Sequence, residues 1–445
     1  MPIRPSHAAR MLRSRLARQI AEQTIANLAV QGLGAITTFS FVHLLPPHQY
    51  AIFGLCIATV GFVSVSSDLG LMASTSYFWR HQVTGGAPFA EHYAAIKRVR
   101  LVLFAFTGSI GGGVLAWLVH RESGDWTAAL SIAPLALALA WTQILMAMSV
   151  AALRLSGDLR RAYLADLSGA VTRASLALAA FALALQHAWF PLISLGIAAL
   201  VTLSIVQPRL DPAFRSRGHA TRDAVRQVVR YIIPTTPSTI FFATQDILVY
   251  WLATLSGGAI VIAQTFALGR LGAIFVTLSA IMANVIIPRI VNIADDRHAL
   301  RTALVTVAAI GGFCSALLFV AWMVPGLFLI LLGNHYAGLA EPLLLCLGAA
   351  SLQVVAHGLG NMNRAMGWVR WETPMICVQA VLVAAIVPFF HFSTTKGVLG
   401  FNLVLNALWL ANIAAVTLLG VRQMRRRGQS PEMHPEDQPE TPLVS

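Results

Sequence analysis

Two long apolar runs between residues 230 and 288 each carry one full charge deep inside the run. They are joined by the short turn Ser256-Gly257-Gly258, and each can cross a bilayer, which takes about 20 apolar residues. In helices that rise about 1.5 Å per residue, Asp246 and Arg270 both lie roughly 16–20 Å from this turn. Charges at that depth are costly and almost always face a bundle interior or a watery cavity. The two runs therefore predict antiparallel helices that line a polar space.

The other polar residues of these runs share the faces of the two charges. They are Thr235, Thr239 and Tyr250 in the first run and, at seven-residue spacing from Arg270, Thr277 and Asn284 in the second. An apolar helix with one polar stripe is typical of a helix that lines something wet. We therefore expect Thr239, Thr277 and Asn284 to line the same cavity as Asp246 and Arg270.

Composition indicates a membrane protein. Of the 445 residues, 57% are hydrophobic and only 11% are charged, whereas about 25% are charged in soluble domains. The net charge of +13 does not indicate nucleic-acid binding, because the basic residues are spread through the gaps between apolar runs. The four cysteines lie within apolar runs at no disulfide or metal-ligand spacing, so no metal site is expected.

The apolar runs predict an all-α polytopic protein with about twelve transmembrane helices. We place them at roughly 20–45, 50–76, 99–119, 127–153, 162–186, 189–206, 230–254, 259–287, 302–331, 339–360, 372–391 and 397–421. No clear signal-peptide cleavage site follows the first run, so we expect it to be retained as a helix. Because the number of spans is even, both ends of the chain are expected on the same side of the membrane.

The distribution of basic residues agrees with this topology. Of the 31 Lys and Arg residues, 27 fall on the side of the N-terminus, and Arg121 and Lys396 fall on the other side. The remaining two, Arg173 and Arg270, lie within spans. Because cytoplasmic loops carry an excess of Lys and Arg, this asymmetry predicts cytoplasmic N- and C-termini.

The longest gap between spans divides the chain into two halves of six spans each. We expect a basic cytoplasmic tail at 1–19, an N-terminal six-helix bundle at 20–206, a cytoplasmic linker at 207–229, a C-terminal six-helix bundle at 230–421 and a disordered cytoplasmic tail at 422–445. Two such bundles packed around a central cavity are common among transporters.

The charges inside the spans are the candidate binding residues. Asp246 and Arg270 are either a buried structural ion pair or a cavity site, in which Arg270 meets an anionic substrate and Asp246 orients it or exchanges a proton. Arg173 lies near the middle of the fifth span, and Asp166 is too far away on the same helix to pair with it. One deep arginine from each half suits a substrate that carries phosphate, since guanidinium groups bind phosphate bidentately.

Three other polar features have simpler interpretations. Asp68, toward the cytoplasmic end of the second span, is expected to cap a helix or pair with a nearby arginine, and Asp166 is a second polar residue of the cytoplasmic side. Asn402 and Asn406, four residues apart in the last span, are expected to form interhelical hydrogen bonds.

The sequence gives little sign of an enzyme. It contains no nucleotide-binding P-loop, and no His, Asp or Glu cluster with the spacing of a membrane-bound transferase or metalloprotease. No catalytic residue and no cofactor are therefore expected.

Several short stretches are similar to those of a known family. They are Pro46-Pro47-His48-Gln49-Tyr50-Ala51-Ile52-Phe53-Gly54, Ser67-Asp68-Leu69-Gly70, Asp246-Ile247-Leu248, Pro288-Arg289-Ile290 and Gly333-Asn334-His335-Tyr336. With the twelve spans, they resemble the polysaccharide flippases of the Wzx type in the multidrug/oligosaccharidyl-lipid/polysaccharide (MOP) exporter superfamily, whose fold is MATE-like.

The resemblance implies a multi-pass flippase of the bacterial inner membrane, working by alternating access. Its substrate would be a polyprenyl-pyrophosphate-linked oligosaccharide for O-antigen, capsule or exopolysaccharide assembly, and its partners would include membrane lipids and a coupling ion, H⁺ or Na⁺. Arg173 and Arg270 would meet the pyrophosphate, and Asp246 is the candidate for coupling.

Two alternatives stay open. A drug or metabolite antiporter of the same superfamily would favour carboxylates over arginines in its cavity. A membrane-embedded transferase or polymerase of the same pathway would ordinarily carry a catalytic motif in a substantial loop, and the expected outer loops are very short.

Overall fold

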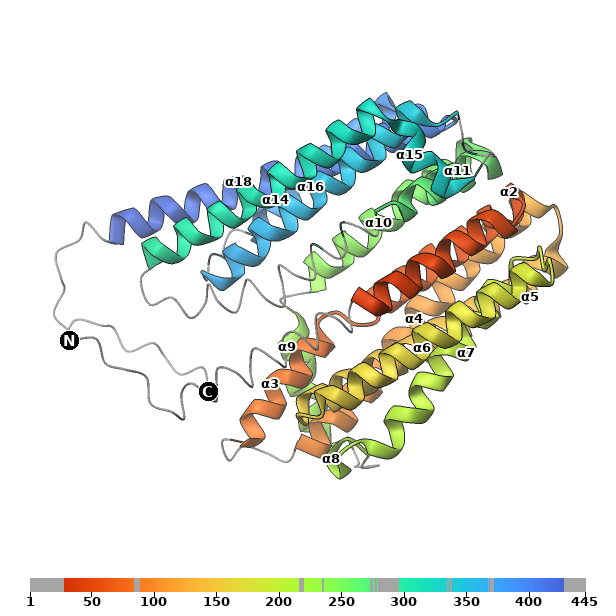
Figure 1. Ribbon diagram of the computed structural model, residues 1–445. Coiled ribbons are helices and arrows are strands. Elements are labelled where there is room, and N and C mark those ends of the chain that lie inside the picture. The colour runs from red at the N-terminus through yellow and green to blue at the C-terminus, as the bar shows by residue number, and fades with distance from the viewer. Residues whose placement is uncertain are drawn as a thin grey trace, which may run out of the picture.

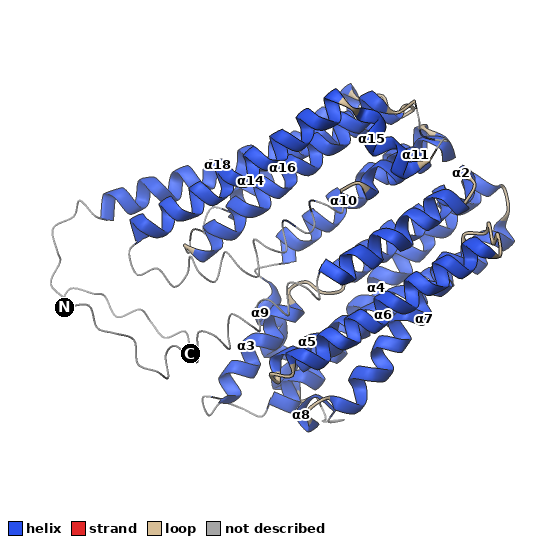
Figure 2. Cartoon of the chain, viewed as in Figure 1, coloured by secondary structure: helices blue, strands red, loops and turns tan. Residues whose placement is uncertain are grey.

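The computed structural model describes most of the chain. The described residues are 28–83, 89–215, 220–233, 236–272, 275, 278, 296–333, 336, 338–366, 368 and 372–427. The tail expected at 1–19 lies outside them, and so do residues 279–287 of the eighth predicted span and residues 428–445 of the tail expected at 422–445. Residues 422–427 of that tail, expected to be disordered, belong instead to a helix that ends at Arg427. All regular elements in the described part are helices (Figure 2).

The first half comprises a helix at Leu28–Leu44 and α2 to α9. The bounds are α2 Pro47–Ser66, α3 Leu71–Val83, α4 Phe89–Ser123, α5 Trp126–Leu155, α6 Leu159–Ala182, α7 Trp189–Val206, α8 Pro212–Arg215 and α9 Arg222–Ile232, with a 3₁₀ turn at Gln207–Arg209. Side chains fix several helix starts: Asp125 accepts hydrogen bonds from backbone N–H groups at the start of α5, and Asp158 does so for α6.

The second half comprises α10 to α18. The bounds are α10 Thr236–Ser256, α11 Gly258–Arg270, α14 Asp296–Met323, α15 Pro325–Leu329, α16 Ala340–Ala365, α17 Glu372–Ile386 and α18 Thr395–Arg427, with 3₁₀ turns at Ile330–Leu332 and Val387–Phe389.

The predicted spans match the described helices in order and position. Nine of these helices are long and apolar enough to cross a membrane, and the shorter apolar helices Leu28–Leu44, Gly258–Arg270 and Pro374–Phe389 match the first, eighth and eleventh predicted spans. The chain is thus a multi-pass helical membrane protein, as its composition predicted.

The second predicted span, 50–76, is not one continuous helix. α2 ends at Ser66, and α3 begins only at Leu71. Between them, Leu69 has φ 42° and Gly70 has φ 90°. A left-handed backbone cannot continue a right-handed helix, so the chain turns here and α3 takes a new direction.

The interval predicted as a linker, 207–229, is largely helical, and α9 runs past its end to Ile232. Thr221 caps α9 by accepting a hydrogen bond from the N–H of Ala224. Ala224, Val228 and Ile232 form a buried apolar stripe, and α9 packs with it against α3 and α4. The spans were predicted from long apolar runs, and the amphipathic helix α9 contains no such run.

The long helices run side by side along one direction (Figure 1). We call the end that carries α3, α8 and α9 the inner end, and the end where α4 stops at Ser123 the outer end. α2 stands at the junction of the halves, since it packs against α4 and α5 of its own half and against α10 and α11 of the other.

Close packing at this junction depends on small residues. A Cβ on Gly54 of α2 would lie 2.6 Å from the ring of Phe266 in α11, so the two helices could not approach as they do with a larger residue. The main buried core accordingly includes residues of both halves, such as Tyr50, Phe266 and Phe401.

Candidate functional site

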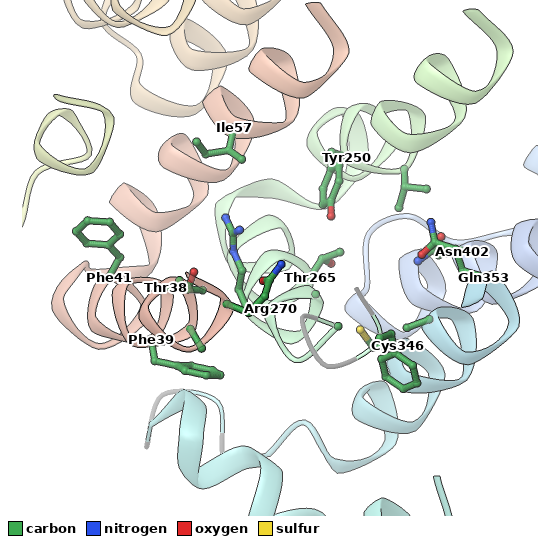
Figure 3. A pocket seen from close by; sticks show the side chains of 18 of the residues that line it. Thr38, Phe39, Phe41, Ile57, Tyr250, Thr265, Arg270, Cys346, Gln353 and Asn402 are labelled. Carbon is green, nitrogen blue, oxygen red and sulfur yellow. The ribbon is translucent and has the colours of Figure 1, made fainter. Parts of the chain in front are cut away.

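A cavity of about 830 Å³ lies between the two halves and is lined by both. The first half contributes residues of the first helix, α2, α5, α6 and α7, and the second contributes residues of α10, α11, α16 and α18. Figure 3 shows part of this lining, with Thr38 of the first helix, Arg270 of α11 and Gln353 of α16 around one space. The two-bundle architecture around a central cavity is therefore present.

Arg173 of α6 is one of the two charged residues of the lining. Gly34 of the first helix lies beside it, because a Cβ at this position would be 3.6 Å from Nη2 of Arg173. The Nε of Arg173 is buried and has no hydrogen-bond partner in the part of the chain that the structure describes. An arginine held among apolar helices with an unused donor is suited to bind an anion.

Arg270 is the second charge of the lining and comes from the last residue of α11. Its guanidinium carbon lies 5.5 Å from the ring centre of Phe266, one turn earlier on the same helix. The fully buried Tyr50 of α2 interacts with this guanidinium across the junction. Within the described residues, the Nε of Arg270 also lacks a hydrogen-bond partner, and Figure 3 shows the side chain extending from its helix into the cavity.

The charge of the described lining is wholly positive. Arg173 and Arg270 belong to it, and no carboxylate does among the residues that the structure describes. The side chain of Asp246 and the whole of Thr277 and Asn284 lie outside the described residues, so their predicted roles stay predictions. Thr239 is half-buried on α10 and is not part of the lining described.

Carboxamides are the part of the lining that the sequence did not reveal. Gln31, Gln143, Gln245 and Gln353 all border the cavity. Each is a single glutamine in an apolar helix, and periodicity alone does not separate such a residue from one that faces a neighbouring helix. A glutamine in the middle of a predicted span was the only available signal.

Asn402 and Asn406 also line the cavity. They were predicted to form hydrogen bonds between helices, but the hydrogen bonds that join the two residues lie within one helix. Nδ2 of Asn406 donates to the backbone O and to Oδ1 of Asn402 at 2.9 and 3.1 Å, both within α18. Residues four apart on a helix are stacked neighbours, so the two amides satisfy each other.

A chain of amides connects the cavity to the interior of the second half. Gln379 of α17 donates to Oε1 of Gln245 at 3.3 Å and accepts from Nδ2 of Asn412 of α18 at 2.9 Å. These bonds join α10, α17 and α18, so this wall of the cavity has a fixed arrangement.

The two carboxylates predicted as polar residues of the cytoplasmic side, Asp68 and Asp166, form ion pairs. Asp68, at the break after α2, lies 3.1 Å from Nη1 of Arg100, whose side chain is only 5% exposed. Asp166 of α6 lies 2.7 Å from Nη2 of Arg154 of α5. Neither belongs to the described cavity lining.

The halves are also joined at the outer end. Nη2 of Arg121, near the end of α4, donates to the carbonyl of Leu255 near the end of α10 at 2.7 Å. The adjacent Glu122 interacts with the backbone N–H of Ala259 at the start of α11. A cation at a helix C-terminus and an anion at a helix N-terminus both match the helix dipoles. We call this pair, Arg121 and Glu122, the outer clamp.

No protein-family model and no curated protein sequence matches the chain. Solved structures do match it over nearly its whole length. A multidrug resistance MATE family transporter of the MOP superfamily, in an inward-facing conformation, has a TM-score of 0.63 and 17% identity, covering 92% of this chain and 100% of its own. The lipid II flippase MurJ, in an inward closed conformation, has a TM-score of 0.65 and 10% identity, covering 92% and 93%.

The chain has the fold of MOP superfamily transporters. A further match with this fold is a MOP transporter from Pyrococcus furiosus, with a TM-score of 0.56 and 16% identity over 92% of this chain and 95% of its own. Its structure is described as having a binding pocket of reverse polarity that suggests a different function. A shared fold does not fix the substrate, so the residues of the cavity must decide between substrates.

Proposed function

We propose that this protein is a flippase that carries a polyprenyl-pyrophosphate-linked oligosaccharide across the bacterial inner membrane for O-antigen, capsule or exopolysaccharide assembly. The observation that carries the proposal is that Arg173 and Arg270, one from each half, line a single cavity. The described lining of this cavity has no carboxylate. The fold shared with a lipid II flippase supports it.

The two guanidinium groups suit a pyrophosphate better than a cationic substrate. Each guanidinium offers five N–H donors in a planar fork that matches phosphate oxygens, and its charge is permanent. Two arginines facing one cavity without a described acid repel each other and repel cations, and a bound dianion relieves both effects. In a membrane interior, charged residues are rare and mark substrate or ion pathways.

In this proposal, the head of the substrate enters the cavity between the halves. The sugar and pyrophosphate would occupy the polar space between the bundles, while the polyprenyl chain stays in the lipid. Transport by alternating access then requires the halves to separate at one end and close at the other. The outer clamp is a contact that must break when the outer end opens.

Orientation and coupling complete the proposal. The excess of Lys and Arg at the inner end supports a cytoplasmic location for that end and for both termini. H⁺ or Na⁺ would supply the energy, and Asp246, which adjoins the cavity-lining Gln245 in sequence, is the candidate coupling residue. The protein would not act as an enzyme.

A MATE-like antiporter of cationic drugs is the second candidate, because MATE transporters share the fold. The positive charge of the described lining argues against it, since cations would be repelled by Arg173 and Arg270. A transferase or polymerase of the same pathway has weaker support, because the described connection between the first helix and α2 is only residues 45–46.

A deletion strain separates these functions. We expect loss of the surface polysaccharide together with accumulation of the pyrophosphate-linked unit in the inner leaflet, and recovery when wild-type protein is supplied. Normal polysaccharide with altered sensitivity to cationic drugs would instead support the antiporter and contradict the flippase.

A further inference from the structure

Three glutamines of the cavity lining have no partner within the described protein. They are Gln31 of the first helix, Gln143 of α5 and Gln353 of α16. Each side chain is half-buried, and none forms a hydrogen bond to another described residue. By contrast, the buried amides of Gln245 and Gln379 bond to each other. The free carboxamides therefore have their hydrogen-bonding capacity directed to what enters the cavity.

Carboxamides are chemically matched to uncharged, hydroxyl-rich groups. An amide presents two N–H donors and a carbonyl acceptor, and a sugar hydroxyl both donates and accepts, so the two satisfy each other without ionisation. A carboxylate in the same place would select amines. The described lining combines amides with arginines and contains no acid, which disfavours amino sugars with a free ammonium group.

We propose that Gln31, Gln143 and Gln353 form a subsite for an uncharged sugar, next to the arginines that hold the pyrophosphate. This assignment rests on the proposed function and deepens it, because it names the class of sugar. The three glutamines come from both halves, so a sugar in contact with all of them bridges the first and second bundles.

Binding to the purified full-length protein in nanodiscs tests the subsite. The probes are farnesyl diphosphate and farnesyl diphosphate that carries one N-acetylglucosamine. We expect the sugar to tighten binding to the wild type. Each of Gln31→Leu, Gln143→Leu and Gln353→Leu should reduce this gain in affinity about fivefold, which corresponds to the loss of one neutral hydrogen bond. Affinity for farnesyl diphosphate alone should stay within twofold.

The matched control is Gln264→Leu. Oε1 of Gln264 accepts a hydrogen bond from Thr395 at 2.5 Å, and the residue is not part of the lining. This variant should keep the full gain from the sugar. A probe that carries glucosamine with a free amine should bind more weakly than the N-acetylated probe.

The outcomes separate the subsite from the function. If the sugar adds no affinity, or its gain survives in the triple Leu variant, the subsite is wrong while the pyrophosphate site stands. If the wild type binds neither probe, the proposed function fails instead. Tighter binding of the free-amine probe would also overturn the preference for uncharged sugars.

Discussion

Replacing the cavity arginines is the most informative perturbation of this protein. Arg173→Ala and Arg270→Ala each remove a guanidinium whose Nε has no hydrogen-bond partner among the described residues, so the loss is expressed in substrate binding more than in folding. Removing one partner of a buried charge pair costs about 2–5 kcal/mol. At about 1.4 kcal/mol per tenfold, affinity for a prenyl diphosphate should fall roughly 30-fold to several thousand-fold.

Lysine at either position should recover part of this loss. It keeps the charge and loses the bidentate fork, so one charged hydrogen bond of about 1.5–3 kcal/mol is forfeited. Since both arginines would contact one group, the double Ala variant should cost less than the sum of the single variants by at least about 0.5 kcal/mol.

Calorimetric titration of the purified protein with farnesyl diphosphate measures these effects, and export of surface polysaccharide by the same variants measures transport. Arg160→Ala is the matched control, because Arg160 lies on the same helix as Arg173, is exposed and is not part of the lining. Wild-type affinity and export in both Arg173→Ala and Arg270→Ala, at normal membrane levels, would refute the reasoning.

Three further predictions concern the surrounding structure. Gly34→Leu should abolish export and Gly34→Ala should retain it, because a Cβ is accommodated at 3.6 Å from the α6 guanidinium and a longer side chain is not; equal export would contradict this. Asp68→Ala should destabilise the protein by about 3–5 kcal/mol by leaving buried Arg100 unpaired, and an unchanged melting temperature would refute the pair. Arg121→Gln should loosen the outer clamp, so that Cys346, which lines the cavity, reacts severalfold faster with an impermeant thiol reagent added outside; an unchanged rate would contradict the clamp.

Much of the fold follows from hydropathy, because a bilayer forces each span to satisfy its own backbone and to expose apolar side chains. The positions of the spans could therefore be predicted. The placement of Arg173 and Arg270 in a common lining could be predicted too, because a charge in the middle of a span must face the interior of the protein. The same reasoning also predicts Asp246 in the lining, and this stays a prediction because its side chain lies outside the described residues.

Other features depend on contacts that no single segment shows. The break after Ser66 is set by the left-handed backbone of Leu69 and Gly70. Mean hydropathy does not detect a change in backbone conformation. The clamp of Arg121 on the carbonyl of Leu255 joins residues far apart in the chain. Glutamines that line a cavity look the same in sequence as glutamines that pair with each other.

The central claim is that the protein moves a pyrophosphate-linked sugar lipid between leaflets. Its most direct test is the purified protein reconstituted into liposomes that contain a short polyprenyl-diphosphate-linked sugar, with the outer-leaflet fraction followed by an impermeant lectin. The account predicts rapid exchange between leaflets with wild-type protein and the rate of empty liposomes with the Arg173→Ala/Arg270→Ala double variant. Exchange at the empty-liposome rate with wild-type protein under both an H⁺ and a Na⁺ gradient, or equal exchange by the double variant, would contradict it.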